Sequence, residues 1–217
     1  MSDKIKAAIF DMDGTLIDSM WVWEKIDIEY LKKFDIEIPN DLRGDIEHLN
    51  FSETAKYFKN RFNISDSIDD IMNDWNQMAY KHYLNDVKLK TGVKEYLQFL
   101  KSQKIKIGLA TSNCTLLTET VLKRLGIYDF FDSITITDEV GKCKDFPDIY
   151  LLAAKKLGAL PSECVVFEDI LMALISAKKA GMRVVAVHDK YSTTSVEYLK
   201  QKSDKFILSF EELTAQT

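Results

Sequence analysis

The chain has 217 residues, of which 46% are hydrophobic and 11% aromatic, and its formal net charge is −5. This composition supplies a full hydrophobic core and excludes a disordered chain, while the acidic balance argues against a nucleic-acid-binding surface. The three cysteines form no C-x-x-C pair, and no apolar run approaches the roughly 18 residues of a membrane span. We therefore expect a cytoplasmic protein with reduced thiols and without a nucleic-acid or membrane partner; the composition leaves its oligomeric state open.

In chain order, the predicted elements begin with one strand and three segments of helical spacing: Ile5–Phe10, then Trp21–Phe34, Ala55–Phe62 and Ile68–Met78. Ser52 is a candidate cap for the second helix. Ser67 and Asp70 match a capping box at the start of the third. Trp21 and Trp23 are predicted to pack in the core of this helical region, and whether they contact a substrate is left open.

From about residue 90, short apolar strands alternate with single helices. Four further strands are predicted: Ile105–Ala110, Ile134–Ile136, Val165–Phe167 and Val184–Val187. Strands separated by single helices form right-handed βαβ units and a parallel sheet. The predicted fold class is therefore α/β: a Rossmann-like parallel sheet core flanked by helices, with an α-helical cap domain inserted after the first strand. We assign residues 1–17 and 89–217 to the core and residues 18–88 to the cap.

Polar residues stand at the ends of four predicted strands. These groups are Asp11-Met12-Asp13-Gly14-Thr15, Thr111-Ser112-Asn113, Lys142-Cys143-Lys144-Asp145 and Glu168-Asp169. In an open parallel sheet, ligands bind at the carboxyl ends of the strands, where helix N-termini also point. We therefore expect these groups to converge, although they are spread over most of the chain.

Taken together, these residues match a phosphoryl-transfer site. Carboxylates from neighbouring strands supply the hard oxygen ligands that Mg²⁺ prefers. An aspartate can attack phosphorus and form an acyl phosphate, which water then hydrolyses. Gly14 lets the backbone approach the phosphate closely. The predicted donors to the phosphate oxygens are Thr111, Ser112, Asn113 and Lys144. Each motif alone is more typical of a loop or a helix cap, and it is their order at four strand ends that favours catalysis.

The motif D-x-D-G-T-L at residues 11–16, in series with the threonine, lysine and acidic-pair motifs, resembles the haloacid dehalogenase superfamily. The resemblance covers nearly the whole chain and concerns the subgroup with a helical cap, which includes phosphoglycolate phosphatases and β-phosphoglucomutases. It implies that Asp11 is the nucleophile and a Mg²⁺ ligand. It implies that Asp13 is the general acid and base, with its backbone carbonyl on the metal. The remaining implied roles are phosphate binding by Thr111 and Lys144 and metal binding by Asp169 and Glu168.

The chain departs from the family pattern in two places. The usual G-K-P-x-P-D reads Cys143–Asp148 here and lacks the first proline, so Lys142 rivals Lys144 for the lysine role. We prefer Lys144 because it keeps the spacing to the second proline. The usual E-D-S-x-x-G reads as residues 168–173 here, without the serine and the glycine.

The expected function is Mg²⁺-dependent hydrolysis of a small phosphorylated metabolite, such as a sugar phosphate, through an aspartyl phosphate. The first alternative is a β-phosphoglucomutase-type phosphotransferase, whose relatives carry a histidine on the first cap helix and basic residues before the second. Counted without gaps, these positions fall on Trp23 and near Leu49 and Glu53, which favours hydrolysis. Arg43 and His48 are nearby residues that leave the mutase open.

The second alternative is a phospho-receiver signalling domain, which is also an α/β sheet with a phosphorylated aspartate, a lysine and Mg²⁺. Such domains have about half this length and carry the aspartate after the third strand, without a helical insert. Here the D-x-D motif follows the first strand, and Asp13 supplies the acid and base that a hydrolase needs. The sequence therefore favours the enzyme.

Overall fold

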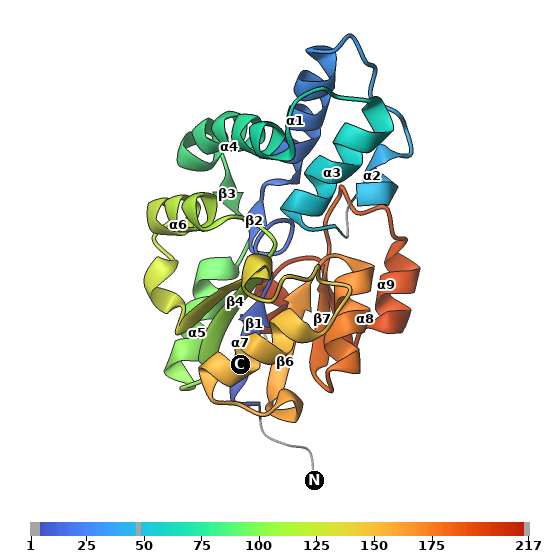
Figure 1. Ribbon diagram of the computed structural model, residues 1–217. Helices are drawn as coiled ribbons and strands as arrows, with labels where there is room; N and C mark the ends of the chain where they lie inside the picture. The colour runs from blue at the N-terminus through green and yellow to red at the C-terminus, as the bar shows by residue number, and fades with distance from the viewer. Residues whose placement is uncertain (1–4, 47–48, 215–217) are drawn as a thin grey trace.

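The centre of the protein is a six-stranded parallel sheet with the strand order β5-β4-β1-β6-β7-β8 (Figure 1). The structure, a computed structural model, describes residues 5–46 and 49–214. The strands of the sheet are β1 (Ala7–Phe10), β4 (Lys106–Thr111), β5 (Ser133–Ile136), β6 (Cys164–Glu168), β7 (Arg183–Val187) and β8 (Lys205–Ile207). The predicted α/β class is confirmed, and all five predicted strands are present.

Helices cover both faces of the sheet because the strands bury side chains on both faces. In β1, Ala8 and Phe10 belong to one apolar cluster, whereas Ala7 and Ile9 belong to the other. Phe10 stacks on Phe167 of the neighbouring strand, with 4.6 Å between ring centroids. Helices α5 (Val93–Ser102), α6 (Thr115–Arg124) and α10 (Glu211–Thr214) lie on the Phe10 side, and α7 (Asp148–Leu157), α8 (Leu171–Lys179) and α9 (Val196–Lys202) on the other.

Four of the helices between β1 and β4 sit over the carboxyl ends of the strands (Figure 1). They are α1 (Met20–Lys32), α2 (Leu42–Ile46), α3 (Phe51–Phe62) and α4 (Ile68–Asn85). Trp75 of α4 is buried among the rings of Tyr30, Phe51 and Phe58, with centroids 4.8–5.7 Å away. This aromatic cluster joins α1, α3 and α4, so the region has apolar packing of its own.

The two connections between the sheet and this helical region run side by side. Strand β2 (Ile17–Asp18) pairs antiparallel with β3 (Lys88–Leu89) in a small second sheet. The sequence did not predict these strands, because two residues are too few to show an alternation. It also missed β8 and α2, which are only three and five residues long.

The caps of α3 and α4 test two details of the sequence analysis. Ser67 caps α4 and forms the predicted capping box with Asp70. The prediction of Ser52 as the cap of α3 is wrong, because Asn50 caps that helix and Ser52 lies within it. Asn50 accepts from the backbone N–H of Glu53 at 2.9 Å, and Glu53 accepts from that of Asn50 at 3.0 Å. The box requires a carboxylate three residues after the cap, and only Asn50 has one there.

Short 3₁₀ turns complete the chain at Tyr128–Phe130, Thr137–Glu139 and Pro161–Glu163. No helix in the described part of the chain combines the length and the apolar character needed to cross a membrane.

Replacing the cap of α4 should destabilise the protein. We expect Ser67→Ala to lower the free energy of unfolding by about 1 kcal/mol, because the backbone N–H of Asp70 loses its acceptor. Urea unfolding measures this loss. Ser65→Ala, an exposed serine that caps no helix, is the matched control and should change stability by less than about 0.5 kcal/mol. Equal effects of the two substitutions would contradict the capping role.

Candidate active site

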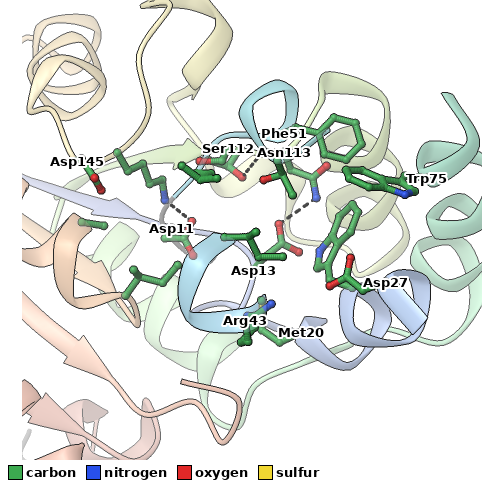
Figure 2. Close-up of a pocket in the computed structure, with 18 residues that line it drawn as sticks. Asp11, Asp13, Met20, Asp27, Arg43, Phe51, Trp75, Ser112, Asn113 and Asp145 are labelled. Atoms are coloured by element: carbon green, nitrogen blue, oxygen red, sulfur yellow. Dashed lines mark hydrogen bonds and ion pairs between the residues drawn. The ribbon is translucent and has the colours of Figure 1, made fainter. Parts of the chain in front are cut away.

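Polar residues that follow β1, that end or follow β4 and that follow β5 meet in a cavity of about 140 Å³ at the carboxyl ends of the strands (Figure 2). Strand β1 pairs with both β4 and β6, so the three strand ends lie next to one another. Residues of α1, α2, α3 and α4 line the opposite side. The predicted site residues that line this cavity are Asp11, Asp13, Thr111, Ser112, Asn113 and Lys144.

Three predicted metal ligands form a buried acidic cluster. Asp11, Glu168 and Asp169 each offer a carboxylate oxygen, and these oxygens all lie within 4.8 Å of one another. Asp11 follows β1, and Glu168 ends β6, so the parallel pairing of these strands brings the acids together. The hydroxyl of Thr15 donates to Asp169 Oδ1 at 2.8 Å.

The cluster holds more negative charge than its neighbours balance. Burial raises the pKa of Asp11 to about 7; Lys144 opposes this shift and Glu168 adds to it. Burial also raises the pKa of Asp169 well above its usual value, with Glu168 and Asp11 adding to the effect. Hard carboxylate oxygens with excess charge are suited to a divalent cation such as Mg²⁺. The residues therefore fit the expected metal, with Asp11, Glu168 and Asp169 as its side-chain ligands.

Lys144, and not Lys142, lies in the site. The Lys144 ammonium group donates to Asp11 and, at 2.7 Å, to Glu168 Oε1. Burial alone would lower the pKa of Lys144, but these two carboxylates raise it. Lys142 is half-exposed and pairs with Asp148 at 2.8 Å instead. The spacing argument thus selected the buried lysine, although its partners here are carboxylates, which the sequence analysis had not predicted.

Gly14 is required at its position for two reasons that the structure adds to the predicted one. Its φ of +82° is in the left-handed region that favours glycine. A Cβ atom there would also lie 2.4 Å from Asp169 Oδ2. Any side chain at this position would therefore displace a carboxylate of the acidic cluster.

The Asp13 side chain points away from the acidic cluster and is held by residues of two regions. The hydroxyl of Ser19 donates to Asp13 Oδ1 at 2.6 Å, and the Asn113 amide donates to Oδ2 at 3.0 Å. The phenol of Tyr83, on α4, also donates to Oδ1. The carboxylate is thus separate from the acidic cluster and fixed at the cavity wall, where it could transfer a proton to or from a bound ligand.

Tyr83 and Ser19 are site residues that the sequence analysis missed. Tyr83 continues the buried face of α4 at four-residue intervals, after Trp75 and Ala79. A tyrosine on the buried face of a helix needs a hydrogen-bond acceptor for its hydroxyl group, and this requirement could have indicated a polar partner for Tyr83. Trp23 also lines the cavity, where its indole N–H donates to the Tyr83 oxygen at 2.9 Å. Trp23 therefore packs against the core, as predicted, and also faces the cavity.

The segment Thr111-Ser112-Asn113 forms a tight turn between β4 and α6. Thr111 Oγ1 accepts from the backbone N–H of Asn113 at 3.0 Å. Asn113 Oδ1 accepts from the backbone N–H of Cys114 at 2.8 Å. The turn places three polar side chains at the cavity wall, beside Lys144.

Comparison with known proteins places this geometry in a wider group. Residues 8–187 match the haloacid dehalogenase-like hydrolase family. A phosphorylated carbohydrates phosphatase of Thermotoga maritima is 30% identical over 178 residues, which cover 82% of each chain. A beta-phosphoglucomutase of Bacillus subtilis is 30% identical over 192 residues, which cover 84% of this chain and 83% of the mutase. These are enzymes, and they argue against a receiver domain.

The fold has a close counterpart among solved structures. The crystal structure of CbbY from Rhodobacter sphaeroides in complex with phosphate has a TM-score of 0.85 to this chain, with 24% sequence identity and 96% coverage of both chains. Sheet and helical region therefore share their arrangement with that protein.

Removing the buried ammonium group should destabilise the protein. In metal-free buffer we expect Lys144→Met to lower the free energy of unfolding by about 3 kcal/mol, because Asp11 and Glu168 lose the buried ammonium group that forms an ion pair with each of them. Lys142→Met removes a half-exposed ion pair and should cost less than about 1 kcal/mol. Urea unfolding of both variants measures the two changes. Equal losses in the free energy of unfolding would contradict the claim that the buried ion pairs of Lys144 contribute more than the half-exposed pair of Lys142.

Proposed function

This chain belongs to the haloacid dehalogenase-like hydrolases and is a phosphatase of phosphorylated compounds, and we propose that it hydrolyses a small phosphorylated metabolite in a Mg²⁺-dependent reaction through an aspartyl phosphate on Asp11. The resemblance read from the D-x-D-G-T-L motif is thereby confirmed at the level of the family. The observation that carries the proposal is the position of Asp11, whose carboxylate belongs both to the acidic cluster and to the cavity wall.

The proposed reaction has two displacements at phosphorus. In the first, an Asp11 carboxylate oxygen forms a bond to phosphorus while the ester P–O bond breaks. Asp13, at the cavity wall, gives its proton to the leaving oxygen. In the second, a water molecule gives a proton to Asp13 and attacks the aspartyl phosphate, which releases inorganic phosphate and restores the Asp11 carboxylate.

The other proposed roles follow from charge and position. The Lys144 ammonium group and the Thr111–Asn113 turn would hold the phosphate oxygens, with Gly14 allowing close approach of the backbone. Mg²⁺ would be held by Asp11, Glu168, Asp169 and the backbone carbonyl of Asp13. A bound Mg²⁺ supplies positive charge that favours the approach of an anionic substrate to a carboxylate.

We further propose a division into a catalytic core of residues 1–17 and 89–217 and a cap of residues 18–88. The antiparallel β2–β3 pair between the two parts supports these boundaries, because both connections cross there. The cap would supply contacts to the leaving group, since α1 to α4 line the side of the cavity away from the acidic cluster. The three free cysteines support a cytoplasmic location.

A mutase is the second candidate, favoured by the identity to a beta-phosphoglucomutase. A mutase must relay a proton and hold a second phosphate in its cap. Trp23, at the histidine position, donates its N–H to Tyr83 and cannot relay a proton. Leu49 is apolar, and Glu53 is committed to the α3 capping box. Of the two nearby substitutes, Arg43 lines the cavity, whereas His48 lies outside the described residues.

The nucleophile is tested by Asp11→Asn, which is nearly isosteric but cannot form the acyl phosphate. With Mg²⁺ and p-nitrophenyl phosphate we expect kcat to fall to below about one thousandth of the wild-type value. Mass spectrometry of acid-quenched wild-type enzyme should find a phosphoryl group on Asp11. The exposed Glu29→Gln serves as the amide control and should keep full activity. Substantial turnover by the purified Asp11 variant would refute the proposed nucleophile.

Hydrolysis and isomerising transfer are distinguished by one incubation. With β-glucose 1-phosphate, a trace of glucose 1,6-bisphosphate and Mg²⁺, we expect free phosphate to form faster than glucose 6-phosphate, because Trp23, at the histidine position, cannot relay a proton. Coupled assays follow both products. If glucose 6-phosphate forms faster, the protein is a mutase.

A further inference from the structure

The helical side of the cavity contains two charged side chains with no role in the chemistry described above. Asp27 comes from α1 and Arg43 from α2, and Figure 2 shows Asp27 on the same side as Trp75, away from Asp11, and Arg43 beside Met20. We propose that Asp27 and Arg43 form a specificity pair that binds the hydroxyl groups of an uncharged polyol or sugar leaving group. This inference rests on the proposed phosphatase function and names the class of its substrate.

Among the described residues, Arg43 Nε and the Asp27 carboxylate have no hydrogen-bond partner. Arg43 Nε is fully buried and donates to no acceptor in the described part of the chain. The Asp27 residue is only 8% exposed, and no described residue donates a hydrogen bond to its carboxylate. Counting the described residues, the cavity wall therefore presents one unused donor and one unused acceptor, although buried polar groups are normally paired.

Keeping Asp27 in this place costs stability. Burial raises its pKa to about 7; Arg43 opposes this shift and the nearby Glu24 adds to it. Arg43 thus lies close enough to act on Asp27, yet the described residues include no ion pair between the two. An apolar residue would serve the packing of α1 better, so the carboxylate is explained by something that binds to it.

A hydroxyl group satisfies both side chains at once, because it donates one hydrogen bond and accepts another. The hydroxyl can donate a hydrogen bond to the Asp27 carboxylate and accept one from Arg43 Nε. A charged leaving group would be attracted by one member of the pair and repelled by the other, whereas a neutral hydroxyl can form a hydrogen bond with both. The apolar wall formed by Trp23, Phe51 and Trp75 suits the C–H faces of a polyol or sugar.

The first test compares phosphate release by the wild-type enzyme from three six-carbon monoesters. We expect kcat/KM for sorbitol 6-phosphate to exceed that for hexyl phosphate, which has no hydroxyls, by about tenfold or more. It should exceed that for 6-phosphogluconate, which adds a carboxylate, by a similar factor. Equal values for sorbitol 6-phosphate and hexyl phosphate would overturn the pair while leaving the phosphatase intact. No phosphate release from any ester would instead remove the proposed function itself.

The second test changes the pair. Asp27→Leu and Arg43→Met should each lower kcat/KM for sorbitol 6-phosphate about tenfold, mainly through KM, and should lower that for hexyl phosphate much less. Asp27→Asn serves as a milder variant in case the leucine variant fails to fold. Glu29→Gln removes an exposed carboxylate from the same helix and should keep the wild-type preference. Equal losses on both substrates would overturn the proposal.

Thermal unfolding at pH 8 separates recognition from a structural role. The raised pKa of Asp27 means that its contribution to stability is lost as the pH rises through about 7. Asp27→Leu should therefore melt above the wild type at pH 8 while losing the polyol preference. A lower melting temperature together with equal losses on both substrates would make Asp27 a structural residue.

Discussion

The structure depends on placing three carboxylates within 4.8 Å of one another inside a protein. Each loses solvation there, and each raises the cost of ionising the others. The parallel pairing of β1 with β6 keeps Asp11 close to Glu168 and Asp169 in spite of this repulsion. Apolar packing on both faces of the sheet supplies the stability that the cluster consumes. Lys144 then compensates part of the charge, and the remainder makes the site receptive to a cation.

Asp13 depends on a different arrangement, since its side-chain partners come from both sides of the cavity. Asn113 belongs to the turn after β4, whereas Tyr83 is on α4. The Asp13 carboxylate, the proposed proton-transfer group, therefore has all these partners only when the helical region lies over the strand ends. Lys90 strengthens that junction, because its ammonium group contacts the Gly14 carbonyl and forms an ion pair of 2.8 Å with Asp189. The same packing that closes the cavity thus also sets the geometry of the acid.

The sequence predicted those parts of the site that depend on strand order and missed those that depend on packing between helices. Asp11 and Lys144 could be found because they follow strands, and parallel strand ends converge whatever the side chains nearby. Tyr83 could not be assigned to Asp13 in advance, since that contact depends on how α4 rests on the sheet. Asn50, by contrast, could be found from the sequence. Glu53 stands three residues after it and completes a capping box, whereas Ser52 has no carboxylate at the corresponding position.

On both sides of the cavity, the charges of the side chains determine which group of a ligand can bind, but the two sides favour different groups. Near β1 and β6, the unbalanced negative charge of the acidic cluster favours the binding of a cation, which in turn can bind an anionic group. On the helical side of the cavity, Asp27 and Arg43 oppose each other in charge, so a charged group is attracted by one and repelled by the other, whereas a neutral hydrogen-bonding group can pair with both. A ligand that satisfies both sides must be anionic at one end and neutral but hydrogen-bonding at the other. A phosphate ester of a polyhydroxy alcohol has this distribution, whereas a bisphosphate does not, so the charge pattern of the whole cavity favours hydrolysis over the handling of a bisphosphate.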